Sequence, residues 1–110
     1  MDKKVAQRVL ERAGGYCEKC GGTLYDAYNL HHRKLKSRGG KDQVSNLIAV
    51  HNYCHIQHKD SIHDNPEESE RNGYMVPSWA KPEEFPLIRP DGSVVLLLED
   101  GSYKLLEKAK

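Results

Sequence analysis

The stretch of sequence that decides the fold begins with CEKC at residues 17–20 and ends with HNYC at residues 51–54. In each motif, two side chains of metal-binding type are separated by two residues. Thiolate sulfur and imidazole nitrogen are both ligands of tetrahedral structural zinc. We therefore predict a structural Zn²⁺ held by Cys17, Cys20, His51 and Cys54. The alternatives are a chance pair of cysteines or a thioredoxin-like redox pair, and the sequence around residues 17–20 lacks the strand and helix that a redox pair requires.

The composition limits the class of protein. The chain has 110 residues, and because only 37% of them are hydrophobic, we expect one small domain with a thin core. The free energy of metal binding can supplement such a core. Three cysteines leave one unpaired in any disulfide framework. No apolar run approaches the roughly 20 residues of a membrane helix, and no apolar signal core follows the N-terminus. We therefore expect a cytoplasmic protein with no membrane partner.

Apolar spacing and turn residues predict a chain of the α+β class. The expected helices cover residues 2–13, 52–61 and 66–71, and the expected strands cover residues 24–33, 47–50, 93–98 and 102–106. A loop is expected at residues 37–45. Asn65 precedes Pro66 and is the expected N-cap of the last helix. The last two strands are close together around Asp100 and Gly101, which predicts a small C-terminal meander.

Two adjacent histidines end the first expected strand. Successive side chains of a strand point to opposite faces, so His31 and His32 cannot share a role unless the strand bends. We expect one of them to bind a metal ion while the other stays free to take a proton. The alternative is a pair of surface histidines without a role.

Further histidines follow the second cysteine motif. Cys54 and His55 are neighbours about 100° apart on a helix, so one can face the structural zinc while the other faces a separate site. His55 and His58 are three residues apart and share a helix face. His63 can converge with His55 if the chain bends near residues 60–61.

The loop after the two histidines is basic, although the net charge of the whole chain is only +1. Its basic side chains are Arg33, Lys34, Lys36, Arg38 and Lys41. Such a block in a near-neutral chain favours a patch that faces phosphates, as in nucleic-acid binding. A solvated loop is the alternative.

Taken in order, these motifs resemble a known family. The order C-x-x-C, His-His, Gly-Gly, Asn-Leu and His-x-x-Cys-His looks like a zinc-containing HNH endonuclease with the ββα-metal fold. Residues 31–40 resemble its first motif, residues 45–50 its central asparagine strand, and residues 54–55 its final histidine. Residues 63–68 and 73–77 look like the HNH proteins of actinobacterial phages. The likeness covers residues 10 to 85.

The resemblance implies roles for single residues. His32 would be the general base that takes a proton from water, and Asn46 would orient the His32 loop by hydrogen bonds. His31 and His55 would hold a catalytic divalent cation (Mg²⁺, Mn²⁺, Ni²⁺ or Zn²⁺). A third ligand is expected from His63, with His58 or water as alternatives, because Lys59 stands where the family has a histidine. His51 likewise replaces a cysteine of many members.

The resemblance also implies the architecture and the function. We expect a small ββα-metal domain stapled by zinc at residues 1–85, which includes the N-terminal helix, followed by a β-meander at residues 86–110 packed on the same domain. The expected activity is metal-dependent hydrolysis of DNA phosphodiesters with low sequence specificity, in phage DNA processing beside a large terminase and in the host cytoplasm. The alternative is a non-catalytic zinc module that binds nucleic acid or a protein partner.

Overall fold

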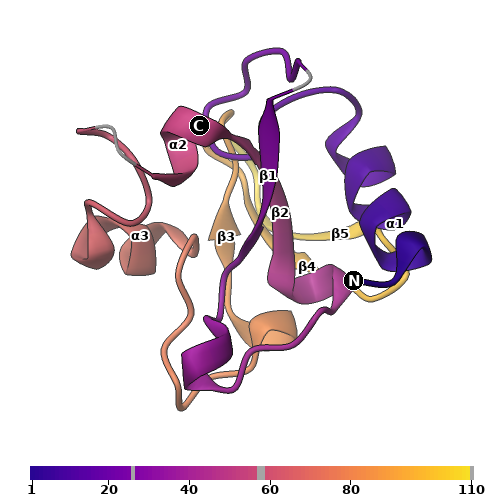
Figure 1. Ribbon diagram of the computed structural model, residues 1–110. Coiled ribbons are helices and arrows are strands. Elements are labelled where there is room, and N and C mark those ends of the chain that lie inside the picture. Colours follow the sequence, from indigo (N-terminus) through magenta and orange to yellow (C-terminus); the bar gives the residue numbers. More distant parts are fainter. Residues whose placement is uncertain (26, 57–58, 110) are drawn as a thin grey trace.

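Two antiparallel strands form the centre of the fold (Figure 1). Strand β1 (Tyr28–His32) pairs with strand β2 (Leu47–His51), and His32 is opposite Leu47 in the register. The coordinates are a computed structural model that describes residues 1–25, 27–56 and 59–109. β1 starts four residues later than the sequence predicts, so the expected strand over residues 24–33 is too long at its N-terminal end.

All five residues of β2 are buried because both faces of the strand are covered. On one face, Leu47 and Ala49 pack with Val9 and Ala13 of the N-terminal helix. On the other face, Ile48 and Val50 pack in a second cluster that includes Leu87, Val95 and Leu97 from the C-terminal sheet. Side chains that alternate along a strand face two different layers. Strand β2 is therefore the shared wall of two small hydrophobic cores.

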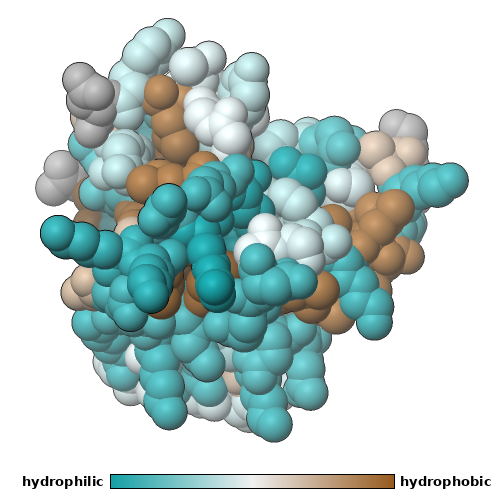
Figure 2. All heavy atoms as spheres, turned by 90° about the vertical axis from the view of Figure 1, so that its right-hand side faces the viewer, coloured by the Kyte–Doolittle hydropathy of each residue, from teal (hydrophilic) through white to brown (hydrophobic). Residues whose placement is uncertain are grey.

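The N-terminal helix α1 (Lys3–Ala13) confirms the prediction from apolar spacing. The carboxylate of Asp2 accepts a hydrogen bond from the backbone N–H of Lys4 and caps its first turn. Gly14 ends the helix in the left-handed region at φ 63°. Figure 2 shows the face of the molecule that carries α1, where hydrophilic side chains cover most of the surface.

The segment between the two central strands folds back on itself through two short 3-10 turns, η1 (Lys36–Arg38) and η2 (Val44–Asn46). Gly40 is required at this return because a Cβ there would lie 1.7 Å from the carbonyl oxygen of Lys34. The expected loop over residues 37–45 is therefore confirmed, and within it Gly40 lies against the backbone of Lys34 and Leu35.

The helix expected over residues 52–61 is much shorter in the structure. Helix α2 (Asn52–His55) ends at Ile56, which has extended backbone at φ −149°. The chain then returns, and the N–H groups of Ile62 and His63 donate to the carbonyls of Cys54 and His55. The return brings the fully buried Ile62 into the core, and this burial accounts for the early end of the helix.

Helix α3 (Pro66–Asn72) lies where the sequence predicts it, and Gly73 ends it in the left-handed region. Asn65 occupies the N-cap position, but its side chain makes no capping bond. Its amide donates instead to the carbonyls of Lys59 and Ser61, which pins the returning segment to the start of the helix.

The C-terminal residues form a three-stranded antiparallel meander in the order β3-β4-β5. Its strands are β3 (Leu87–Ile88), β4 (Val94–Leu97) and β5 (Tyr103–Glu107), and a 3-10 turn, η3 (Pro82–Glu84), precedes them. The α+β class and the meander are confirmed, while β3 is too short for a sequence pattern to reveal. Across the ranges that the structure describes, no helix combines the length and apolar character needed to span a bilayer.

Candidate functional site

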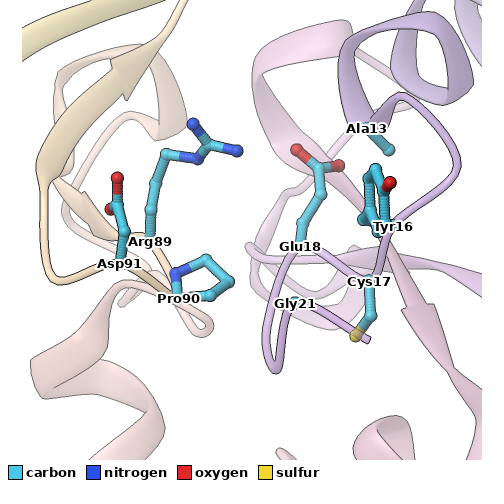
Figure 3. A pocket seen from close by; sticks show the side chains of 8 residues that line it. All are labelled: Ala13, Tyr16, Cys17, Glu18, Gly21, Arg89, Pro90 and Asp91. Atoms are coloured by element: carbon cyan, nitrogen blue, oxygen red, sulfur yellow. The ribbon is translucent and has the colours of Figure 1, made fainter. Parts of the chain in front are cut away.

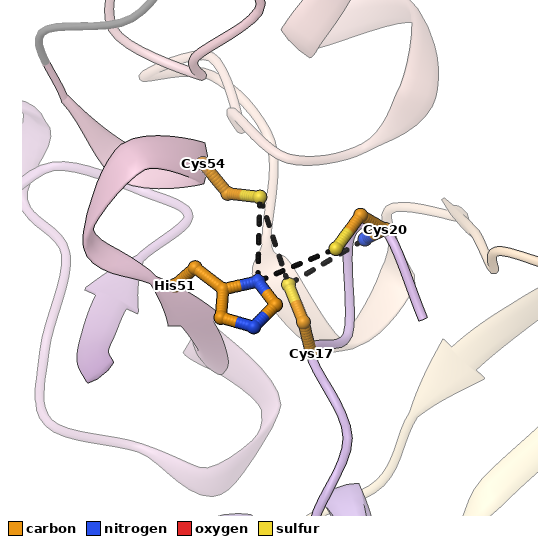
Figure 4. Close-up of side chains that lie close together, drawn as sticks. All are labelled: Cys17, Cys20, His51 and Cys54. Atoms are coloured by element: carbon orange, nitrogen blue, oxygen red, sulfur yellow. Dashed lines mark hydrogen bonds between the residues drawn. The ribbon is translucent and has the colours of Figure 1, made fainter. Parts of the chain in front are cut away.

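Four metal-binding side chains from three parts of the chain converge beside the end of β2 (Figure 4). Cys17 and Cys20 come from the turn after α1, His51 ends β2, and Cys54 lies in α2. One ligand atom from each residue lies within 4.8 Å of all the others. The structure therefore groups Cys17 and Cys20 with a histidine and a third cysteine, as the zinc prediction requires.

The distances fit a tetrahedral ion. A zinc ion bonded to sulfur at about 2.3 Å and to nitrogen at about 2.0 Å has S···S and S···N edges of about 3.8 and 3.5 Å. The Sγ atoms of Cys17 and Cys54 are 3.8 Å apart, and Nδ1 of His51 lies 3.3 Å from Sγ of Cys20 and 3.8 Å from Sγ of Cys54. These four residues could hold a zinc ion.

Surrounding groups prepare these atoms for a cation. Nε2 of His51 donates to the carbonyl of Thr23 at 2.8 Å, which leaves the Nδ1 lone pair facing the sulfurs. Burial acts to raise the pKa of Cys20, but the N–H of Gly22 and the neighbouring thiols outweigh it, so this pKa lies below its ordinary value. Burial raises the pKa of Cys54 to about 12, so a nearby cation is needed to hold it as thiolate.

A second group consists of three imidazoles: His31 from β1, His55 from α2 and His63 from the returning segment. Their ring centroids are 4.7 to 5.4 Å apart. The Nε2 atoms of His55 and His63 are separated by 3.0 Å, and two nitrogen ligands of one ion are expected at about 3 Å. The return of the chain after Ile56 creates this convergence. The alternative ligand His58 lies outside the described residues.

The other ring nitrogens of two of these histidines are already engaged. Nε2 of His31 donates to the carbonyl of Tyr74 at 2.7 Å, and Nδ1 of His55 lies 3.1 Å from Oδ1 of Asn29. Such bonds fix the tautomer that offers the remaining nitrogen to a metal. Sequence reasoning missed Asn29, although a residue two positions before His31 lies on the same strand face.

Burial favours the neutral form of His31 and His55, the form that binds a metal. It lowers the pKa of His31 to about 3 and also lowers the pKa of His55, with smaller contributions from the neighbouring imidazoles. His31 is 1% exposed, so its proton affinity in the folded protein is far from that in water. The three residues form a group that could hold a metal ion.

His32 points to the opposite face of β1 and is not part of either group. Its Nε2 donates to the Oδ1 atom of Asp42 at 2.6 Å, and both side chains are partly exposed. This hydrogen bond lowers the pKa of Asp42, with a further contribution from Lys36. Among the described residues, Nδ1 of His32 has no hydrogen-bond partner. Asp42 was not recognised from the sequence because it lies in a loop ten residues away.

Asn46 is fully buried and joins the two ends of the loop that carries Asp42. Its Oδ1 accepts from the backbone N–H of Lys34 at 2.7 Å, and its Nδ2 donates to the carbonyls of Lys34 and Lys41, each at 3.0 Å. The bonded positions lie two residues after His32 and one residue before Asp42. Asn46 therefore holds the loop closed beside His32.

The basic residues of this loop are exposed, partly buried or, in the case of Arg33, fully buried. Lys36 and Lys41 are exposed. Lys34 and Arg38 are partly buried and donate to the carbonyls of Ala80 and Val76, at 2.9 and 3.5 Å.

The expectation that Arg33 contacts DNA is wrong, because its side chain is 0% exposed. Its guanidinium donates four hydrogen bonds of 2.6 to 3.1 Å, which end on the carbonyls of Ser45, Gly73, Pro82 and Phe85. Burial lowers the pKa of Arg33 to about 9. Arg33 follows β1 two residues after His31 and extends the buried face of that strand. It therefore joins the central strands to the C-terminal part of the chain.

A cavity of about 320 Å³ lies between the cysteine turn and the start of the meander (Figure 3). Glu18 and Arg89 line it from opposite sides. Both oxygens of Glu18 are already bonded to Arg12, and they also accept from the Tyr103 hydroxyl and the Ala49 backbone. The cavity therefore lies at a contact between parts of the fold, where the Glu18 carboxylate joins the cysteine turn to β2 and β5 by hydrogen bonds.

Comparison with known protein families gives one match, which spans the four residues of the zinc group and part of the histidine group. The family model for the HNH endonuclease matches residues 17–61. The match includes all four residues of the zinc group, together with His31, His32, Asn46 and His55, and it ends before His63. Comparison with curated proteins and with solved structures gave no match. Proteins of the matched family are nucleases that act on DNA, which supports nuclease activity in general. Residues 17–61 therefore match the HNH endonuclease family, and this stretch contains a group of three cysteines and one histidine that could hold a structural zinc ion.

Proposed function

We propose that this protein is a metal-dependent DNA endonuclease that hydrolyses phosphodiester bonds with low sequence specificity. The observation that carries the proposal is the division of the two adjacent histidines. His31, which is buried, joins the partly buried His55 and His63, while His32 faces the other way and, among the described residues, one of its ring nitrogens has no hydrogen-bond partner. Metal-dependent hydrolysis of a phosphodiester uses both a cation and a base, and these two positions can supply them.

In this proposal His31, His55 and His63 hold the catalytic divalent cation. When bound, the cation neutralises charge on the phosphoryl oxygens and on the leaving oxygen. The three imidazoles admit Mg²⁺, Mn²⁺, Ni²⁺ or Zn²⁺, and nitrogen ligands favour the transition metals among these. Burial holds His31 and His55 in the neutral form without any rearrangement of the side chains.

His32 is the proposed general base. Because its Nε2 proton is donated to Asp42, its Nδ1 carries the lone pair that takes a proton from the attacking water. Asn46 keeps the loop after His32 in place through the backbone of Lys34 and Lys41. The role of Asn46 is thus to position the loop without touching the substrate.

The proposed DNA contacts are made by exposed basic side chains of the loop. Lys36 and Lys41 are exposed and can reach phosphates, and Lys34 and Arg38 contribute positive charge while they donate to backbone carbonyls. Contacts with phosphates fix the register of a duplex but carry no sequence information, which accounts for the proposed low specificity. Binding should weaken steeply with salt.

The zinc group has a structural role in this proposal. It joins the turn after α1 to the end of β2 and to α2, and so holds His55 at a fixed place beside His31. We assign residues 1–85 to the nuclease domain and residues 86–110 to an extension packed on it. The shared core of Ile48 with Leu87 and Val95 supports this assignment.

We extend the proposal to phage DNA processing beside a large terminase, in the cytoplasm of the host cell. The likeness of residues 63–68 and 73–77 to the HNH proteins of actinobacterial phages supports this context. Co-expression with the large terminase encoded in the same genome, followed by affinity purification of one partner, tests the association. Recovery of the purified partner without the other protein would contradict the association.

Cleavage of supercoiled plasmid tests the central activity. The zinc-loaded protein is incubated with plasmid and each of Mg²⁺, Mn²⁺, Ni²⁺ and Zn²⁺, and nicked and linear products are measured. We expect cleavage with at least one cation and a loss of about 100-fold or more in His32→Ala, the range for removal of a general base. Zinc content and circular dichroism control for folding. A non-catalytic zinc module predicts DNA binding without cleavage in every metal.

A further inference from the structure

The loop between η1 and η2 places one carboxylate directly against His32. Oδ1 of Asp42 lies 2.6 Å from Nε2 of His32, the shortest of the hydrogen bonds that we describe for the histidines of this chain. The same oxygen is 3.8 Å from Nζ of the exposed Lys36, a much weaker interaction. His32 is therefore the main partner of this carboxylate.

The position of Asp42 is set by groups around it. Asn46 donates to the carbonyl of Lys41, the residue immediately before Asp42, and it also binds both backbone groups of Lys34. Gly40 permits the close return of the chain that these bonds require. The fully buried amide of Asn46 thus controls how closely the carboxylate approaches the imidazole.

A carboxylate in this place has two effects on an imidazole that acts as a base. It accepts the Nε2 proton, so the Nδ1 lone pair is the one offered to water, and it fixes the plane of the ring. It also stabilises the positive charge that the ring carries once Nδ1 has taken a proton.

We propose that Asp42 is a positioning residue for the hydrolytic reaction and acts through His32. This inference rests on the proposed function, because it assumes that His32 is the general base. Asp42 does not touch the substrate or the cation in this assignment.

The kinetic experiment compares variants of the zinc-loaded protein on plasmid DNA with the most active cation. We expect Asp42→Ala to lower kcat by about 10- to 100-fold while KM changes less than about three-fold, the usual cost of removing a partner that orients a functional side chain. Asp42→Asn should be at least as slow, since its amide can donate to Nε2 and move the proton onto Nδ1. Asp42→Glu should recover part of the loss. Glu84→Ala removes an exposed carboxylate from the C-terminal part and should keep wild-type kinetics.

A double variant separates action through His32 from other effects. In the His32→Ala background, Asp42→Ala should cause no further loss of kcat, because the group that it positions is already missing. An equal additional loss in that background would show that Asp42 acts elsewhere and would overturn the proposal. Equal kcat for Asp42→Ala and wild type, or a change confined to KM, would overturn it as well.

A spectroscopic arm tests the contact independently of cleavage. In ¹⁵N-edited spectra of the zinc-loaded protein, we expect a ring N–H resonance protected from exchange that disappears in His32→Ala and in Asp42→Ala but remains in Glu84→Ala. Loss of the resonance in His32→Ala together with its persistence in Asp42→Ala would overturn the proposal. A wild type that cleaves no DNA with any cation would instead refute the proposed function, and the positioning role with it.

Discussion

Replacement of the buried arginine is the perturbation whose size the structure predicts most clearly. Arg33→Met keeps a long side chain but removes a guanidinium that donates four hydrogen bonds to backbone carbonyls. Hydrogen bonds from a charged donor contribute about 1.5 to 3 kcal/mol each. The variant no longer transfers a charged guanidinium from water into the interior, which costs several kcal/mol in the wild type and offsets part of this loss. We therefore expect a net loss of about 3 to 5 kcal/mol in the free energy of unfolding.

Urea unfolding of the zinc-loaded protein, followed by far-ultraviolet circular dichroism, measures this loss. The single tryptophan, Trp79, is 81% exposed and would report folding poorly. Arg71→Met on the exposed surface of α3 is the matched control and should change the free energy of unfolding by less than about 0.5 kcal/mol. If Arg33→Met lowers the free energy of unfolding by less than about 1 kcal/mol and weakens DNA binding, the structural role is refuted and Arg33 is instead a phosphate contact.

Three further perturbations have expected outcomes. In protein that holds zinc only at the cysteines, the pKa of His31 is about 3 in the folded state and 6.5 in the unfolded state, so neutral His31 stabilises the fold fully above pH 6.5 and this stability is lost as the pH falls. Urea unfolding should show that the free energy of unfolding falls by about 2 kcal/mol between pH 7 and pH 5, and that His31→Gln lacks this decrease. Equal pH dependence in the wild type and the variant would contradict this. Removal of residues 86–110 uncovers one face of β2 and should give an insoluble or molten chain, which a sharp thermal transition in the truncated protein would disprove. Lys36→Gln with Lys41→Gln should lower the slope of log K for DNA against log salt by about 2, whereas the same change at the exposed Lys104 and Lys108 should leave it unaltered.

The local parts of the fold could be predicted from the sequence because their signals are short in range. Helix α1 has apolar residues at helical spacing and a glycine at its end, and the spacing of two residues within each metal motif reveals the zinc group. The alternation of side chains along a strand is sufficient to separate His31 from His32. These features depend on neighbours a few residues apart.

The features that the sequence did not reveal depend on contacts between distant segments. The end of α2 at His55 is decided by the burial of Ile62 and by the bonds of the returning chain, whereas the local pattern continues as a helix. The contact of Asp42 with His32 requires the loop closure made by Asn46. Propensity and charge counts do not contain this information.

Arg33 shows how a composition signal can mislead. Within the sequence it belongs to a basic block, and a count of charges places it at a phosphate-binding surface. A stricter use of strand alternation places it on the same face as Asn29 and His31, which is the face that turns inward. Four carbonyls then satisfy a charge that would otherwise be too costly to bury.

Metal stoichiometry tests most directly the central claim that this chain has two separate metal sites. Wild type, Cys17→Ser and His31→Ala are saturated with zinc, freed of excess metal and analysed by native mass spectrometry. We expect two ions per chain in wild type and one in each variant, with His31→Ala retaining the ion at the cysteines. One ion in wild type, or two in His31→Ala, would contradict the claim that the three histidines bind a metal of their own.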